Sequence, residues 1–239
     1  ISKPGHVAFN TLFIHGSIGV GKTHLLQGVW NRLKKESTNI SVVYKPAENW
    51  TNEFVYSLRS GGLESFRKKY RGVDIFLVDD VHFLSNKKGV QEEFLHTFNT
   101  LHSMSKRVVF ASDAHPRLIA QLKESLASRF MSGMIAKIEQ ASYDTSLQIL
   151  RSKASKVRKK IPENVLEFIS EKFNKNIRSM ESALTTVLAY SNINKTKIDL
   201  SLASNTLSEL YVNKEKSITL QDIEKVIINY YHISRSDIH

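Results

Sequence analysis

Cysteine is absent from all 239 residues, which excludes disulfide bonds and thiolate metal sites. No apolar run approaches the ~20 residues that a membrane-spanning helix needs. The first ten residues, ISKPGHVAFN, lack signal-peptide character, and the sequence has neither repeats nor low-complexity tracts. What remains is a globular chain whose apolar fraction of 41% suffices for a core. The lack of cysteine fits a reducing interior, so we expect a cytoplasmic protein.

Acidic residues are in the minority, since 23 Asp and Glu stand against 34 Lys and Arg and give a formal net charge of +11. A basic balance of this size suits a polyanionic partner, with nucleic acid the first candidate and an anionic membrane the second. The alternative is a lysine-rich proteome that makes many surfaces basic. Charge alone leaves both interpretations open.

Between residues 11 and 138, short β-branched or aromatic runs alternate with helical patterns. This alternation predicts an α/β fold in which a parallel five-stranded sheet carries helices on both faces. The expected strands are 11–15, 41–45, 74–79, 107–112 and 134–139. The expected helices between them are 22–35, 47–70, 88–103 and 116–129.

The strand signal stops near residue 140, and a small all-helical domain is expected to follow. Its predicted helices are 143–158, 162–173, 176–191 and 200–211. A polar link, VNKEKS, then precedes an amphipathic stretch over 218–233. The predicted domains are therefore 1–139, 140–212 and 213–239. The basic run RSKASKVRKK, residues 151–160, is expected to be a solvated helix face.

The stretch HGSIGVGKTHLL matches the phosphate-loop pattern G-x-x-x-x-G-K-[ST] at Gly16, Gly21, Lys22 and Thr23. It follows a predicted strand and opens a predicted helix, which is the setting that the motif requires. Glycines let the backbone N–H groups turn toward phosphate oxygens, and the helix N-terminus adds a favourable dipole. We expect Lys22 to reach the β- and γ-phosphates and Thr23 to offer its hydroxyl to Mg²⁺.

Two carboxylates end the apolar strand DIFLVDD. Asp79 is expected to hold the Mg²⁺ shell, and Asp80 to orient water for attack on the γ-phosphate. A strand-end cap or half of a salt bridge is the alternative for this pair. Aspartate at the second position is one carbon shorter than the glutamate common in ATPases, which suits slow turnover in a switch.

Six stretches together resemble one known family. They are LFIHGSIGVGKTHLLQGV, VDIFLVDDVHFL, QEEFLHTFNTL, FASDAHP, LASRF and NIRSMESAL. Their order and spacing are similar to those of DnaA, the bacterial chromosomal replication initiator, over nearly the whole chain. The resemblance implies an AAA+ ATPase with a helical lid. Such a protein binds ATP or ADP, assembles as an ATP-dependent helical filament at the replication origin, helps to melt the duplex and works with the replicative helicase machinery.

The resemblance also implies roles for three residues beyond the loop. Asp113 resembles the sensor 1 residue beside the γ-phosphate, with capping of the next helix as its alternative. Arg129 resembles the arginine finger that reaches ATP on the next subunit. Arg178 resembles sensor 2, which reaches back to the nucleotide of its own subunit. A surface salt bridge is the alternative for Arg129, and pairing with a nearby acid is the alternative for Arg178.

These considerations give two sets of candidate residues. The catalytic candidates are Lys22, Asp79, Asp80 and Arg129. The nucleotide-binding candidates are Gly16, Gly19, Val20, Gly21, Lys22, Thr23, His24, Asp113 and Arg178. We expect His24 to be packed or hydrogen-bonded beside the loop, with no metal cluster around it.

Two helical patterns, over 47–61 and 62–72, resemble the insertion that marks initiator-type AAA+ proteins. The family grips single-stranded DNA near here, and Val55 stands at one matching position. At a second position, where the family commonly has arginine, this sequence has Gly89. Lys87 and Lys88 beside it are expected to supply backbone charge instead, and a solvated loop is their alternative.

A second departure is Ser125, at a position where many relatives carry an arginine that bonds to the neighbouring subunit. The N-terminus reads as a chain cut within a larger protein. The last residues resemble the opening of the DnaA DNA-binding domain, so we expect the reader of duplex origin sequences to be missing.

Two other functions remain as alternatives. One is a DnaA-like regulator or helicase loader of the same superfamily. The other is a nucleotide-gated scaffold that does not hydrolyse ATP.

Overall fold

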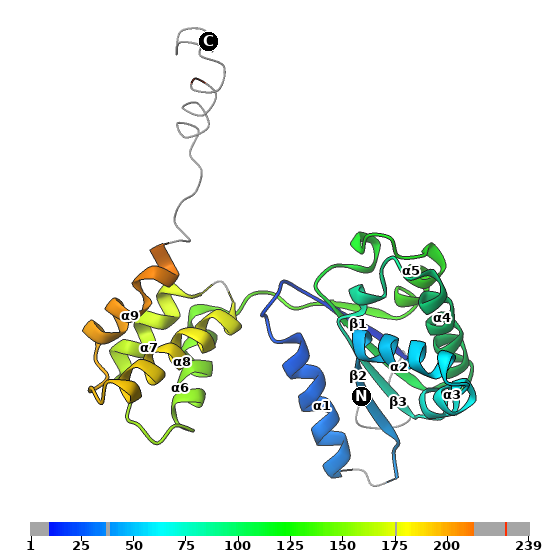
Figure 1. The fold of residues 1–239 in the computed structure, drawn as a ribbon, viewed down its shortest axis with the longest axis horizontal. Coiled ribbons are helices and arrows are strands. Elements are labelled where there is room, and N and C mark those ends of the chain that lie inside the picture. The colour runs from blue at the N-terminus through cyan, green and yellow to red at the C-terminus, as the bar shows by residue number, and fades with distance from the viewer. Residues whose placement is uncertain (1–9, 37–38, 175, 213–227, 229–239) are drawn as a thin grey trace. The chain divides into compact units, whose positions relative to one another are not determined.

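A computed structural model describes residues 10–36, 39–174, 176–212 and 228 (Figure 1). These residues form two compact units. The first runs to Ala141 and takes in the later segment Asn176–Arg178, and the second holds the remaining described residues from Ser142 onward. Among the helices of the described residues, none is both long and apolar enough to cross a membrane.

The first unit is built on the predicted five-stranded parallel sheet. The strands are β1 (Thr11–His15), β2 (Val42–Pro46), β3 (Ile75–Asp79), β4 (Arg107–Ser112) and β5 (Met134–Lys137). They lie in the order β2-β3-β4-β1-β5, and every neighbouring pair is parallel. Each strand starts within one residue of its predicted start. The fold prediction is confirmed, although β5 ends two residues early.

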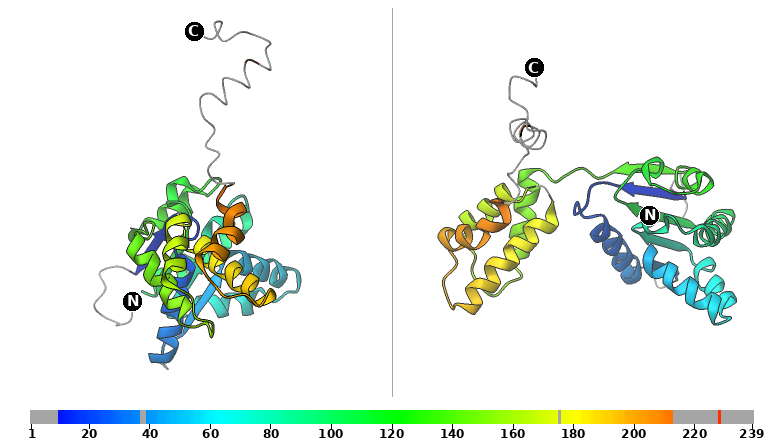
Figure 2. Two further views of the ribbon diagram at one scale, coloured as in Figure 1. Left: turned by 90° about the vertical axis from the view of Figure 1, so that its left-hand side faces the viewer. Right: turned by 45° about the horizontal axis from the view of Figure 1, so that its top comes forward.

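Helices cover both faces of this sheet, as Figures 1 and 2 show for the first unit. They are α1 (Lys22–Glu36), α2 (Ala47–Arg59), α3 (Leu63–Arg71), α4 (Lys88–Ser103) and α5 (Glu124–Phe130), with short 3-10 helices η1 (Val81–Leu84) and η2 (Pro116–Leu118). Side chains alternate between the two faces of a strand. In β1, Phe13 therefore joins the core under α2, α4 and α5, whereas Ile14 joins the core under α1.

Two of the predicted helical regions are divided, one as expected and one not. The region 47–70 holds two helices, as the helical patterns over 47–61 and 62–72 predict, and they separate at Gly61, whose φ of 74° lies in the left-handed region that favours glycine. The region 116–129 is not one helix, because the chain leaves helical geometry at Gln121, with φ 56°. The buried side chain of Gln91 holds this segment: its Nε2 donates to the Gln121 carbonyl at 3.0 Å, and its Oε1 accepts from the Lys123 N–H at 2.8 Å.

An aromatic cluster and a charged cluster attach α2 and α3 to the sheet. Trp50 of α2 is fully buried and contacts the rings of Phe66 and Tyr70 in α3, with centroids 5.1 and 6.1 Å away. The Glu53 carboxylate accepts from Tyr70 Oη at 2.7 Å and pairs with Lys45 Nζ of β2 at 2.9 Å. The inserted helices are therefore held to β2 by both apolar and ionic contacts.

The second unit consists of helices in its described residues. They are α6 (Tyr143–Ala154), α7 (Glu163–Lys172), α8 (Ile177–Ile193) and α9 (Leu200–Val212). Fully buried aliphatic side chains such as Leu150, Val165 and Val187 form its core. The predicted amphipathic stretch over 218–233 lies outside the described residues, apart from residue 228.

The basic run 151–160 is only partly the solvated face that the sequence predicts. Three of its basic residues are exposed: Lys156, Arg158 and Lys160. Arg151 pairs with Glu163 across α6 and α7, and Lys159 Nζ donates to the Ser191 hydroxyl at 2.6 Å. Part of the run therefore joins helices within the second unit.

Candidate functional site

The glycine-rich loop connects the carboxyl end of β1 to the first turn of α1. Its shape requires glycine. Gly19 and Gly21 have φ values of 81° and 100°. A Cβ at Gly16 would stand 2.4 Å from the carbonyl oxygen of Ile138. Small residues thus bring the backbone around an open helix N-terminus, where N–H groups and the helix dipole favour an anion.

Lys22, the first residue of α1, is buried with its ammonium group folded back onto the loop. Nζ donates to the carbonyl oxygens of Gly16 at 2.7 Å and Ser17 at 2.9 Å, and it pairs with Oδ1 of Asp113 at 2.7 Å. Only 5% of the side chain is exposed, while Asp113 is 35% exposed. The positively charged ammonium of Lys22 therefore lies at the centre of the loop. It also links the loop to Asp113, the residue that follows β4.

Asp79 ends β3 with its carboxylate buried and oriented by two donors. Tyr44 Oη donates to Oδ2 at 3.0 Å, and the Asp80 N–H donates to Oδ1 at 3.0 Å. Burial, followed by the neighbouring Asp79 charge, raises the pKa of Tyr44 to about 12, although the hydrogen bond from Gln27 opposes the increase. Tyr44 therefore stays protonated at neutral pH and remains a donor to this carboxylate.

Asp80 adopts a left-handed backbone conformation, with φ 54° and ψ 48°, at the start of η1. Such conformations are uncommon for a residue other than glycine and are often retained at functional sites. Burial raises the pKa of the Asp80 carboxyl, and the charge of Asp79 raises it further. A carboxylate in this state is a better proton acceptor than an exposed aspartate.

Two histidines lie at the same edge of the sheet. The rings of His15, which ends β1, and His115 meet edge to face with centroids 5.3 Å apart. Burial lowers the pKa of His15, and the charges of His115 and Lys137 lower it further. His24 is exposed in the first turn of α1 and is not packed as the sequence predicts.

The other nucleotide-binding candidates lie on or near the loop. Val20 is buried and Thr23 is half-buried at the start of α1. Arg178 is exposed in the first turn of α8, and its neighbour Ile177 donates its N–H to the Gly19 carbonyl at 3.0 Å within the first unit. The loop is thus contacted by a residue that lies 158 positions after Gly19 in the chain.

The remaining candidates lie away from the loop. Arg129 is exposed in the last turn of α5, and Ser125 is exposed in the same helix. Within the described residues, no hydrogen bond or ion pair joins Arg129 to the glycine loop. An exposed arginine beyond its own loop is the arrangement that a contact with another subunit requires.

The nucleic-acid candidates also differ in exposure. Val55 is half-buried against the core under α2. Lys87 and Lys88 are exposed at the start of α4, and Lys87 Nζ donates to the Phe83 carbonyl at 2.9 Å. Gly89 is exposed in the same helical turn, with nothing within 4 Å of an added Cβ.

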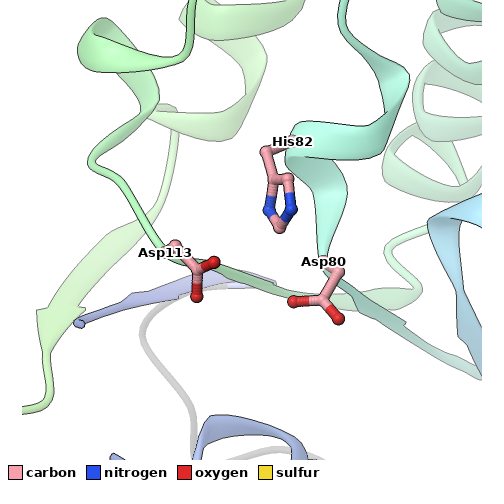
Figure 3. Close-up of side chains that lie close together, drawn as sticks. All are labelled: Asp80, His82 and Asp113. Atoms are coloured by element: carbon pink, nitrogen blue, oxygen red, sulfur yellow. The ribbon is translucent and has the colours of Figure 1, made fainter. Parts of the chain in front are cut away.

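The sequence-based interpretation missed two residues at this edge. Tyr44 orients Asp79 from the neighbouring strand, and His82 of η1 lies beside Asp80 and Asp113 (Figure 3). Each residue had a signal in the sequence. Tyr44 lies in β2, which pairs with the strand that Asp79 ends, and His82 follows Asp80 by two residues.

Comparisons with known proteins agree on one family. The model of the bacterial DnaA ATPase domain matches residues 1–137. The chromosomal replication initiator protein DnaA of Thermoanaerobacter sp. (strain X514) is 42% identical over 230 residues, which cover 96% of this chain and 52% of that protein. The chain therefore spans about half the length of this curated relative.

Two solved structures add to this result. Domain III of the Thermotoga maritima replication initiation protein DnaA superposes with a TM-score of 0.81 at 38% identity, covering 85% of each chain. A replication initiator DnaA bound to AMPPCP and single-stranded DNA superposes with a TM-score of 0.65 at 29% identity, covering 83% of this chain and 70% of the other.

Proposed function

The chain belongs to the family of bacterial DnaA ATPase domains, and from this premise we propose that it binds ATP and ADP and hydrolyses ATP slowly. The observation that carries the proposal is the position of Lys22, buried at the centre of a glycine loop whose N–H groups and helix N-terminus suit phosphate. The binding of AMPPCP, an ATP analogue, by a related initiator supports the same ligand.

Nucleotide binding exchanges partners at Lys22. In the structure its ammonium bonds to Gly16, Ser17 and Asp113. The β- and γ-phosphates of ATP take over as partners of this charge, which frees Asp113 to face the γ-phosphate as a sensor. Gly16, Gly19, Val20, Gly21, Thr23 and His24 make up the rest of the loop and its helix start, and Arg178 approaches from the later segment.

We propose that Mg²⁺ is held by the Thr23 hydroxyl and the Asp79 carboxylate. The donor set fits, because hard cations prefer oxygen ligands and Asp79 is a buried carboxylate with a fixed orientation. When bound, Mg²⁺ neutralises charge on the β- and γ-phosphates. Asp80 orients the attacking water and accepts its proton, which its raised pKa favours.

This proposal is tested by measuring ATP binding and phosphate release for the wild type and Lys22→Ala. We expect the variant to lose at least tenfold in ATP affinity, since it removes a charge-assisted contact worth about 1.5–3 kcal/mol. Lys35→Ala, at the exposed end of α1, is the matched control and should bind as the wild type does. Equal affinity in all three proteins would refute the assignment, and binding without phosphate release would favour a non-hydrolysing scaffold.

We further propose that ATP drives self-association into a helical filament, with Arg129 reaching the γ-phosphate of the next subunit. The exposed position of Arg129 in α5 supports this arrangement. In this proposal residues 1–139 act as the nucleotide-binding domain, 140–212 as the lid, and 213–239 as the start of a DNA-binding domain. The assembly serves replication initiation: it melts the origin duplex in the cytoplasm, where the bacterial chromosome lies, and engages the replicative helicase.

Single-stranded DNA is the proposed nucleic-acid ligand of this part of the protein. The initiator relative bound to single-stranded DNA supports it, as do the exposed ammonium groups of Lys87 and Lys88 and the position of Val55 on the inserted helix α2. The double variant Lys87→Ala/Lys88→Ala should weaken binding of a labelled oligonucleotide and flatten its salt dependence. Lys34→Ala/Lys35→Ala is the control, and equal losses in both would point to net charge alone.

A related regulator or helicase loader is the competing function. The match to a replication initiator over 96% of this chain favours the initiator.

A further inference from the structure

Three potential metal ligands from different elements converge at the edge of the sheet. Asp80 follows β3, His82 lies in η1, and Asp113 follows β4 (Figure 3). Each offers one ligand atom, and these three atoms all lie within 4.8 Å of one another. In Figure 3 the imidazole ring points into the space between the two carboxylates.

The backbone around these ligands is well fixed. The buried side chains of Val81 and Leu84 anchor η1 on either side of His82. The Asp80 carbonyl accepts from the Phe83 N–H at 3.0 Å, and the Asp80 N–H donates to Asp79. The histidine and the first aspartate are therefore held on one tight turn.

The imidazole has a nitrogen that no protein group uses. Nδ1 of His82 is buried and lacks a hydrogen-bond partner within the part of the chain that the structure describes. Leaving a buried polar atom in this state costs about 1–3 kcal/mol. Coordination of a metal through Nδ1 gives this atom a polar partner that the described residues do not provide.

The charged groups at this edge of the sheet carry an excess of negative charge, which favours a divalent cation. Asp79, Asp80 and Asp113 bring three carboxylates to this edge, and Lys22 is the ammonium group that pairs with one of them. If Asp113 turns toward a metal, Lys22 keeps its two carbonyl acceptors on Gly16 and Ser17. Binding a cation therefore does not leave the buried ammonium without partners.

The ligand types select the class of ion. Two carboxylates and one imidazole form a mixed oxygen and nitrogen set, which suits Zn²⁺ or Co²⁺, whereas Mg²⁺ prefers oxygen alone. Ligands about 2.1 Å from a tetrahedral ion lie about 3.4 Å from one another. The three atoms lie within 4.8 Å of one another, so a tetrahedral ion needs them to move closer by at most about 1.4 Å.

We propose that Asp80, His82 and Asp113 form a binding site for a borderline divalent cation such as Zn²⁺ or Co²⁺. Its ligands differ from Thr23 and Asp79, the residues proposed to hold Mg²⁺. The site needs no nucleotide, so its test is independent of the proposed ATPase function. Zn²⁺ occupies the end of the loop where the γ-phosphate of ATP is proposed to lie.

The test measures Zn²⁺ binding by titration calorimetry, and Co²⁺ binding by its visible absorption, on the nucleotide-free protein in 5–10 mM Mg²⁺ (about the concentration that saturates weak oxygen sites). We expect one Zn²⁺ per chain that Mg²⁺ does not displace. His82→Gln and Asp113→Asn, which remove ligands from different elements, should each weaken binding about tenfold or more. Circular dichroism establishes that each variant is folded.

His96→Gln is the matched control, because His96 is an exposed histidine on α4 of the same unit. It should bind Zn²⁺ as tightly as the wild type. Wild-type affinity in both ligand variants would overturn the site, and so would an equal loss in the His96 control. Complete displacement of Zn²⁺ by Mg²⁺ would overturn the assigned class of ion.

Discussion

The carboxylate of Glu53 should stabilise the first unit in a pH-dependent way. Burial alone would raise its pKa, but hydrogen bonds from Lys69, Lys45 and Tyr70 outweigh burial and lower the pKa from 4.5 to about 2. Each pKa unit corresponds to about 1.4 kcal/mol, so the difference is worth at most about 3 kcal/mol. Since Lys69 is 52% exposed and the Glu53 side chain 26% exposed, solvent screening reduces our expectation to about 1–2 kcal/mol.

The sign follows from the direction of the pKa change. The folded-state pKa of Glu53 lies below its unfolded value, so folding is favoured above pH 4.5 and this stabilisation is lost as the pH falls toward about 2. By about pH 3, roughly half of it should be gone. Glu53→Gln removes the titrating group, so its free energy of unfolding should be lower than that of the wild type at pH 7, and the two curves should converge in acid.

Urea unfolding followed by tryptophan fluorescence measures the stability of the first unit, which contains Glu53. The chain has two tryptophans, Trp30 in α1 and Trp50 in α2, and both lie in the first unit. Glu48→Gln, at an exposed position of the same helix, is the control and should change stability by less than about 0.5 kcal/mol. Curves for wild type and Glu53→Gln that stay parallel from pH 7 to 3 would refute the reasoning.

Two further predictions concern the loop and its neighbouring strand. Gly16→Ala would place a Cβ 2.4 Å from the Ile138 carbonyl, so urea unfolding should give a loss of about 1–3 kcal/mol. Gly28→Ala, on an open face of α1, should gain about 0.5–1 kcal/mol. Tyr44→Phe removes the 3.0 Å hydrogen bond to Asp79, so more Mg²⁺ should be needed for half-maximal ATP turnover. ATP binding in EDTA should not change, and a loss there would assign Tyr44 to the nucleotide itself.

Local patterns in the sequence were sufficient to predict the sheet and the glycine loop. The strands are short, apolar and separated by helical periods, and β3 is buried along its whole length, as the run IFLVD predicts. The loop motif predicts the loop's shape, because its glycines are needed for the backbone conformation and for the close approach of Ile138.

The features that the sequence did not predict depend on contacts between residues that are distant in the chain. The break at Gln121 depends on the side chain of Gln91, which lies 30 residues earlier. The convergence of His82 with Asp113 depends on β3 and β4 being neighbours. Helical periodicity cannot predict either of these two contacts, because it relates only residues within a few turns of one another in the sequence.

The most direct test of the proposed switch is the size of the particle in ATP and in ADP. Sedimentation velocity with a short single strand would compare the wild type with Arg129→Ala, and Arg117→Ala offers an exposed arginine of the same unit as a control. We predict larger species only in ATP, retained by Arg117→Ala and lost in Arg129→Ala. Particle sizes that are the same in ATP and ADP, or that do not depend on Arg129, would contradict an ATP-driven assembly in which Arg129 reaches the neighbouring subunit.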